Sequence, residues 1–419
     1  MLSRIRTKLP GLRAYLRDDS GIALATVVAV SAILFLLATM IIILANNLVS
    51  NTRSQEGRTK ALHMADAGLN AYLYELRRDP SYFVNHPTLG PTSQEDGVWT
   101  VTAVAPAQNV PLQLTATGTI PSMSVTRIVV ASVRFPTYAE YMFLSNADLN
   151  IGADAVIDGK VRSNGNVVNS GHVTGKVSAS GNVSGGGTFD QGYEAHVPRI
   201  DFSQVTVDMA NMRTVATASS AYFNNSGGYG FRVILNGSSA RVEKVTGGTT
   251  TGNLVTTLIR TLTVPSQGVL FFDEDVWVQG NYSTMVTIGG ARDIYVADDL
   301  APSQPNRPFT CGLVSQRSII VPSWYPGMPQ VMELDAAMLA QTGTIYGDYR
   351  SGVTKSKITI RGSMAYNTYG YFALYSGNTV TAGFRQRSYI YDPRLELYPP
   401  PYYPMLRDGS LKVSTWVEQ

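Results

Sequence analysis

The residues of this 419-residue chain best placed to do chemistry are acidic. Asp273, Asp275, Asp293 and Asp298 lie close together in the sequence, beside short apolar triplets that predict strands. Paired carboxylates can cleave glycosidic bonds, and grouped carboxylates can bind calcium. Acidic residues at strand ends also commonly face solvent and protect sheet edges. The sequence therefore leaves three interpretations open: a carbohydrate-active site, a calcium site, and an exposed strand edge.

Other kinds of chemistry lack the residues or the spacing that they need. The single cysteine, Cys311, excludes an intrachain disulfide and a cysteine-based zinc site, and we expect it to be a small buried residue. The four histidines lack the i, i+4 spacing of helical metal ligands, and no Walker loop, GxSxG or HExxH motif occurs. We expect no enzymatic activity, no catalytic or metal-binding residue, and no cofactor other than calcium.

The positive charge of the chain is confined to one end. Residues 1–60 hold eight Lys and Arg against three Asp and Glu, whereas the whole chain has a net charge of only +3. The remaining residues are therefore slightly acidic. A nucleic-acid-binding domain would carry a basic surface on its folded part, so we expect no nucleic-acid partner.

The N-terminal region predicts a membrane segment. No charged residue occurs between Asp19 and Arg53, and the run from Gly21 to Ala45 is long enough to cross about 30 Å of hydrocarbon as a helix. Five basic residues precede it, and the positive-inside rule then keeps residues 1–20 in the cytoplasm. We expect the large C-terminal part to lie outside the cytoplasm.

The same helix continues beyond the apolar run. No proline occurs from Asn46 to Arg78, and apolar residues recur at spacings of three and four: Leu62, Ala65, Leu69, Tyr72 and Leu76. One helix from about Ile22 to Arg78, ended by Asp79-Pro80, would be roughly 85 Å long and must pack its second half on something soluble. A secretory signal peptide has a shorter apolar core and a small-x-small cleavage site.

These features resemble a known family. The basic leader ending in Gly21, the apolar helix directly after it, and the run Ala61-Leu-His-Met-Ala-Asp-Ala-Gly-Leu69 are similar to class III prepilins, especially PilX-type minor pilins and the K-type pseudopilin of type II secretion. The resemblance implies cleavage between Gly21 and Ile22 by a prepilin peptidase. It also implies other major and minor pilins and an inner-membrane assembly platform as partners, with the precursor in the inner membrane and the mature protein in an extracellular pilus.

One position departs from the major pilins that the chain resembles. Their fifth mature residue is a glutamate that neutralises a neighbour's N-terminal ammonium, and here that position is Thr26. A subunit without the carboxylate cannot compensate a charge in the apolar filament core. The departure fits a rare subunit at the filament tip, although a plain membrane anchor would lack the glutamate as well.

After the helix, residues 80–136 predict a pilin-like headgroup. A polar connector over 80–97 precedes three runs rich in Val, Thr and Ile, at Val98–Val104, Leu112–Thr117 and Val125–Phe135. We expect them to form a small antiparallel sheet on the exposed half of the helix. The predicted domain order is thus a leader at 1–21, the long helix at 22–79 and this headgroup at 80–136.

Residues 137–210 differ in amino-acid composition from the preceding part of the chain. Gly, Ser and Asn fill 17 of the 30 positions in 158–187, and valines recur at intervals of 6, 6, 4 and 6: Val161, Val167, Val173, Val177 and Val183. The pattern is typical of a β-solenoid, and a disordered linker is the alternative. Residues 211–388 read as a second β-rich, solenoid-like region, with a short helix expected at Met332–Leu339.

The tail, 389–419, contains the run Tyr398-Pro-Pro-Pro-Tyr-Tyr-Pro404. We expect it to cap the solenoid, with partner binding through exposed tyrosine rings as an alternative. The fold class is then α+β, mainly β.

The predicted function is that of a minor type IV pilin at the filament tip, displaying its body for adhesion to a surface glycan or protein. A membrane-anchored extracellular carbohydrate-active enzyme is the alternative. The same features fit a subunit of a pilus and a subunit of a secretion pseudopilus.

Overall fold

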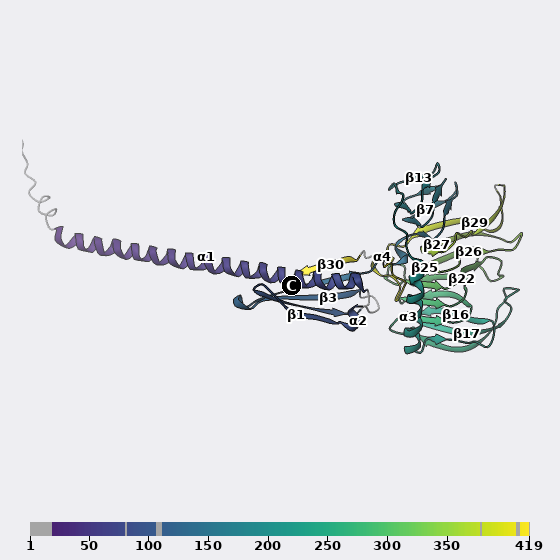
Figure 1. Cartoon of the computed structure of the whole chain (residues 1–419), viewed down its shortest axis with the longest axis horizontal. Coiled ribbons are helices and arrows are strands. Elements are labelled where there is room, and N and C mark those ends of the chain that lie inside the picture. The colour runs from purple at the N-terminus through teal and green to yellow at the C-terminus, as the bar shows by residue number, and fades with distance from the viewer. Residues whose placement is uncertain (1–18, 80–81, 106–110, 378, 408–410, 419) are drawn as a thin grey trace, which may run out of the picture.

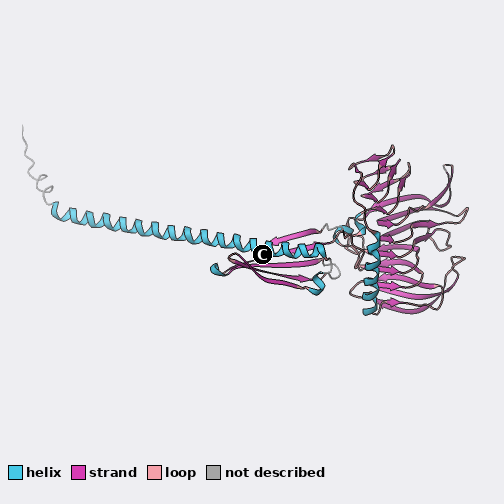
Figure 2. Cartoon of the chain, in the orientation of Figure 1, coloured by secondary structure: helices cyan, strands magenta, loops and turns pink. Residues whose placement is uncertain are grey.

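The computed structural model describes residues 19–79, 82–105, 111–377, 379–407 and 411–418. The fold is α+β and mainly β, as expected (Figure 2). A single long helix runs away from the rest of the chain, a small sheet lies along its second half, and a large β-rich body stands at the end of that sheet (Figure 1). The predicted leader lies largely outside the described residues.

The long helix, α1 (Asp19–Arg78), confirms the expected element and its end before Asp79-Pro80. From Leu24 to Val49 its apolar side chains are exposed, whereas Ala61, Ala65, Leu69 and Tyr72 are buried. The first half is therefore uncovered by any other described part of the chain, and the second half forms one side of a core.

The sheet beside α1 has five antiparallel strands in the order β1-β2-β3-β4-β30. The three expected strands are confirmed, but the predicted polar connector is wrong in part, because it contains the short helix α2 and the strand β1. The fifth strand comes from the C-terminus of the chain and pairs with β4. The elements are α2 (Tyr82–Asn85), β1 (Thr88–Gln94), β2 (Gly97–Val104), β3 (Leu112–Ile120), β4 (Val125–Arg134) and β30 (Lys412–Glu418).

Residues 137–406 form what we call the stacked body. In its first part, short strands lie in parallel on one another: Val161 pairs with Val177, Val167 with Val183, and Ile157 with Val173. Hydrogen-bonded partners are thus sixteen residues apart, and each turn of the chain has three sides. Hence the disordered-linker alternative is wrong.

The strands of these first turns are all very short. They are β5 (Phe143–Ser145), β6 (Leu149–Ile151), β7 (Val156–Asp158), β8 (Val161–Ser163), β9 (Val167–Asn169), β10 (His172–Val173), β11 (Val177–Ala179), β12 (Val183–Ser184), β13 (Thr188–Phe189) and β14 (Tyr193–Glu194).

The second part of the body builds longer turns in the same manner. Parallel pairing runs through β19, β21, β23, β25 and β27, and a three-stranded antiparallel meander, β16 to β18, closes the far end. The strands are β15 (Tyr222–Phe223), β16 (Gly230–Gly237), β17 (Ser239–Gly247), β18 (Val255–Thr263), β19 (Val269–Phe272), β20 (Val276–Tyr282), β21 (Val286–Gly290), β22 (Ile294–Pro302), β23 (Cys311–Ser315), β24 (Ile319–Pro322), β25 (Val331–Ala340), β26 (Ile345–Asp348), β27 (Thr354–Tyr366), β28 (Ala373–Ser376) and β29 (Thr379–Tyr391).

The two parts meet out of sequence order. β27, near the end of the body, pairs in parallel with β5 at its beginning, and β29 pairs with β7. We call this junction the seam. After β14 the chain runs back along the body through the helix α3 (Val205–Ala218) and starts the second part at the opposite end (Figure 1). The helix packs on β19 and β15, and its buried residues share a core with the outer side of the strands.

Two further expectations are wrong. Met332–Leu339 is not a helix but the interior of β25, where every side chain except that of Glu333 is buried, so tertiary burial overrides a helix-favouring composition. The tail is not solely a cap. Tyr403 and Leu406 pack on the body, but β30 leaves it and completes the small sheet.

Close backbone approach fixes the contact between α1 and the small sheet. At Gly118 of β3, an added Cβ would lie 2.1 Å from the Ala61 carbonyl oxygen and 2.4 Å from the Ala65 amide nitrogen. Helical backbone cannot move out of the way as a flexible side chain can. Only glycine therefore lets the strand lie on the helix at this point.

We predict that Gly118→Val separates the sheet from α1. Overpacking against backbone should destabilise the headgroup by at least about 2 kcal/mol, measured as the denaturant midpoint of Trp99 fluorescence. Gly186→Val is the control, because an added Cβ there meets nothing within 4 Å. Equal midpoints for the two variants would contradict this account of the contact.

Candidate functional site

The largest chemically distinctive surface is the first half of α1. Within the described residues, one helix is long and apolar enough to cross a membrane, with a mean hydropathy of 3.0 over its most apolar window, none of which is buried. The few hydroxyls bond back to the helix: Ser31 Oγ donates to the Val28 carbonyl at 2.9 Å and Thr39 Oγ1 to the Phe35 carbonyl at 2.8 Å. The helix can therefore enter an apolar environment without an unpaired hydroxyl at these positions.

The predicted cleavage site lies at the start of this helix. Gly21 and Ile22 have helical backbone within the first turns of α1, and Thr26 lies further along, on the exposed apolar half. Residues 1–18 lie outside the described part of the chain. Cleavage between Gly21 and Ile22 stays a prediction.

The second half of α1 is fixed to the small sheet by its apolar stripe and by one buried hydroxyl. Tyr72 is fully buried, and its hydroxyl donates to the His86 carbonyl at 2.6 Å. Burial raises the pKa of Tyr72 to about 12, so it remains a neutral donor. The sheet thus holds one half of the helix and leaves the other half free to contact a membrane or other helices.

The predicted acidic residues do not form one group. Asp273 makes an ion pair with Arg213 of α3 and accepts a hydrogen bond from the Tyr222 hydroxyl. Asp298 Oδ1 accepts from the Asp299 amide at 2.8 Å. Asp273 is engaged in holding α3, and Asp298 bonds to its neighbour within β22.

Asp275 and Asp293 do come together, on adjacent turns. Asp275 Oδ1 accepts from the Asp293 amide at 3.2 Å, and Asp293 Oδ1 accepts from the Ser318 amide at 2.9 Å. Arg317 lies 3.3 Å from Asp293 Oδ2. Burial raises the pKa of Asp275. Each carboxylate links one turn to the next, and no group of three His, Cys, Asp or Glu able to hold a metal occurs among the described residues.

Cys311 is buried, as expected, and burial raises the pKa of its thiol. It lies in β23, paired with Val286 of β21. A thiol that stays protonated inside the body contributes packing.

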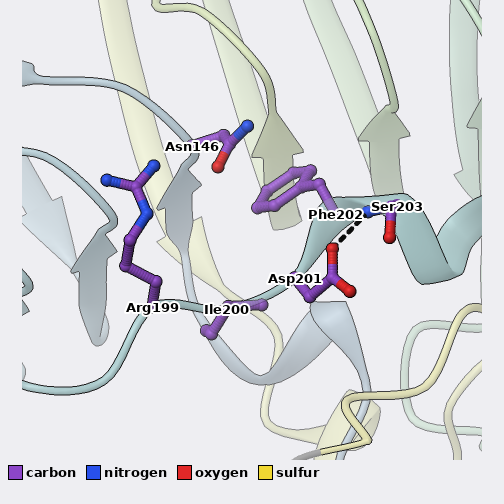
Figure 3. A pocket seen from close by; sticks show the side chains of 6 residues that line it. All are labelled: Asn146, Arg199, Ile200, Asp201, Phe202 and Ser203. Carbon is purple, nitrogen blue, oxygen red and sulfur yellow. Dashed lines mark hydrogen bonds between the residues drawn. The ribbon is translucent and has the colours of Figure 1, made fainter.

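An open hollow of about 420 Å³ lies where the chain leaves the first turns (Figure 3). Its floor is stabilised by Asn164, whose side chain exchanges two hydrogen bonds with the backbone of Ile200, at 2.7 and 2.8 Å. Asp201 accepts from the Ser203 amide at 2.8 Å, and hydrogen bonding to the side chain and then the amide of Ser203 lowers the pKa of the Asp201 carboxyl. The hollow is lined by Asn146, Arg199, Ile200, Asp201, Phe202 and Ser203, and its polar groups largely hold this loop in place.

A group that sequence reasoning missed lies at the seam. Asp154, between β6 and β7, meets Tyr375 and Arg387, more than 200 residues later. Together with Tyr369 and Tyr371 we call these residues the seam cluster. The sequence signalled only an excess of tyrosine near the C-terminus, since the partners are joined by the out-of-order stacking of β29 on β7.

No protein-family model and no curated protein sequence matches the chain. Among solved structures, it is similar to the competence-associated pilin ComZ from Thermus thermophilus, with 12% identity, a TM-score of 0.34, and coverage of 87% of this chain and 97% of that one. It is also similar to an ice-binding protein from Antarctomyces psychrotrophicus, with 11% identity, a TM-score of 0.28, and coverage of 61% and 94%. Scores this low do not establish a common fold.

One buried carboxylate makes the stability of the body depend on pH. Asp335 of β25 has a side chain only 5% exposed, and Arg361 lies 3.3 Å from its Oδ2. Burial raises its pKa to about 6, against a partial opposing effect of Arg361. Because the folded-state pKa exceeds the unfolded one, this group destabilises the fold above pH 6, and the penalty disappears as pH falls toward 4.

We predict that Asp335→Asn stabilises the body at pH 7 by up to about 3 kcal/mol and loses this advantage near pH 4. Arg361→Gln should destabilise the body at pH 7, because it removes the cation that partly stabilises the buried Asp335 carboxylate. Thermal unfolding at pH 4, 5, 6 and 7 measures both. The same pH dependence in wild type and Asp335→Asn would show that Asp335 is not the group responsible.

Proposed function

We propose that the protein is a minor type IV pilin or a closely similar filament subunit, anchored first in the membrane and then among the helices of other pilins. The observation that carries the proposal is the division of α1 into an exposed apolar half and a half packed on a small sheet. About 26 residues from Leu24 to Val49 would expose apolar surface to water unless lipid or other helices cover it.

The geometry distinguishes this arrangement from a simple anchor. A tether needs about 20 apolar residues, and a flexible connection to its domain is enough. Here one rigid helix of 60 residues, about 90 Å long, continues from the apolar part into the folded sheet. A rigid rod with one end inside a domain can be withdrawn from lipid and packed beside similar rods while the domain stays outside.

The proposal assigns the cut between Gly21 and Ile22 to a prepilin peptidase, and membrane extraction to an assembly platform. The body is then extracellular and has a role in surface contact, with no catalysis. The absence of a carboxylate at Thr26 supports a rare subunit. The bulk of the stacked body supports a place at the filament tip, where no further subunit packs above it.

We predict that the mature protein begins at Ile22. Mass spectrometry of protein recovered from the cell surface should show the loss of residues 1–21, because the scissile bond precedes the apolar helix. Gly21→Val should leave the precursor intact and confined to the membrane, and Gly11→Val, in the same leader, should be processed normally. An unprocessed N-terminus in the surface-exposed protein would overturn the proposal.

The tip assignment has its own test. Antibody labelling of the stacked body on sheared filaments should mark one end of each filament, because subunits that carry this body cannot repeat along a shaft without collision. Regular labelling along the shaft would reject tip placement and leave the pilin assignment intact.

A further inference from the structure

Two rings of the seam cluster are exposed, although Tyr369 beside them is partly buried. Tyr371 is 58% exposed and Tyr375 is 44% exposed, whereas Tyr138, Tyr282 and Tyr366 are fully buried. The seam itself is visible in Figure 1, where β29 and β7 are neighbours. Large flat rings at a fixed place on the surface call for a physical explanation.

The cluster also contains a fixed donor and acceptor pair. Arg387 Nη2 lies 2.8 Å from Asp154 Oδ2, and the Tyr375 hydroxyl donates to the same oxygen at 3.0 Å. Arg387 Nη1 donates to the Phe384 carbonyl at 3.0 Å, which holds the guanidinium from behind. The Arg387 side chain is only 14% exposed, but Asp154 is 66% exposed. The carboxylate is therefore held in one position and is open to a ligand.

The rings are held as firmly as the ion pair. Tyr371 packs edge-on against Tyr369 at 4.9 Å, and its carbonyl accepts from the Gly347 amide at 2.8 Å. The Arg387 guanidinium lies 5.4 Å from the centre of the Tyr375 ring. A surface ordered before binding loses little conformational entropy when a ligand arrives.

We propose that the seam cluster binds a saccharide whose pyranose rings carry equatorial hydroxyls. Such a sugar has an apolar C–H face that fits against the Tyr371 and Tyr375 rings, and hydroxyls at its edge that can donate to the exposed Asp154 carboxylate. The combination of exposed aromatic rings with a few fixed polar groups is that of a small-molecule site. This inference rests on the proposed function only because it takes the stacked body to lie outside the cell.

Other ligands fit the cluster less well. An anion would face the exposed Asp154 carboxylate, and an apolar peptide would leave the charged pair partly desolvated without a partner. A neutral polyol can donate to the Asp154 carboxylate and adds no charge beside the Arg387–Asp154 pair. A purely structural clamp across the seam would need the ion pair, but it would not need the exposed Tyr371 ring, and this difference makes the proposal testable.

The experiment measures binding of cellohexaose and chitohexaose to the purified full-length chain by calorimetry. A zwitterionic detergent is needed, since detergents with sugar head groups would compete. Wild type should bind at least one of these β-linked probes, and Tyr371→Ala and Asp154→Asn should each weaken binding at least tenfold. The matched control is Tyr229→Ala, because Tyr229 is a 60% exposed tyrosine elsewhere on the body.

The melting temperature of each variant shows whether it folds. If Tyr371→Ala or Asp154→Asn misfolds, the other substitution still tests the proposal. No binding by wild type, or equal binding by Tyr371→Ala and Tyr229→Ala, would overturn the proposal. Capture of a protein by the cluster with no saccharide binding would overturn it as well. The N-terminal sequence of the mature protein tests the pilin assignment separately, so the two can fail independently.

Discussion

The architecture of the body depends on one constraint: a turn of parallel strands leaves its backbone N–H and C=O groups unpaired until another turn lies on it. The first turns satisfy this requirement on one side by pairing with β27 and β29, which the chain makes last. The chain must therefore travel to the opposite end before it can build its second part. The helix α3 crosses to that end, which is closed by the three-stranded antiparallel meander rather than by another parallel turn.

The crossing helix and the tail then cover the outer side of the strands. Met209, Met212 and Ala216 recur on the buried side of α3 and pack with Phe271 and Tyr403. A buried acid joins the two covering segments, since Asp208 on α3 accepts from Arg407 at 2.6 Å and from the Met405 amide at 3.2 Å. Burial raises the pKa of Asp208 although Arg407 opposes the shift. A helix and a tail from distant parts of the sequence thus form one layer.

Local patterns predicted what local interactions decide. The helix follows from apolar spacing and the absence of proline, and the valine intervals of 6, 6 and 4 mark the three sides of a turn, since Val161 pairs with Val177. Local patterns could not predict three features that depend on a pairing partner elsewhere in the chain. These are the seam, the return of β30 to the small sheet, and the strand at Met332–Leu339. The acidic residues suggested a shared site, but Asp273 and Asp293 hold different elements. The only local signal of the seam cluster is the excess of tyrosine near the C-terminus, and nothing local indicates that Asp154 lies beside it.

The body is attached to the small sheet by two segments from distant parts of the sequence. Two chain segments cross between them, and they are bonded to each other: the Leu406 amide donates to the Pro136 carbonyl at 2.7 Å and the Tyr138 amide to the Pro404 carbonyl at 3.1 Å. They continue into β4 and β30, which are neighbouring strands of one sheet. A force applied at the seam would therefore reach α1 through two paired strands at once. A single linker would let the body swing, whereas this double connection restricts its direction relative to the helix.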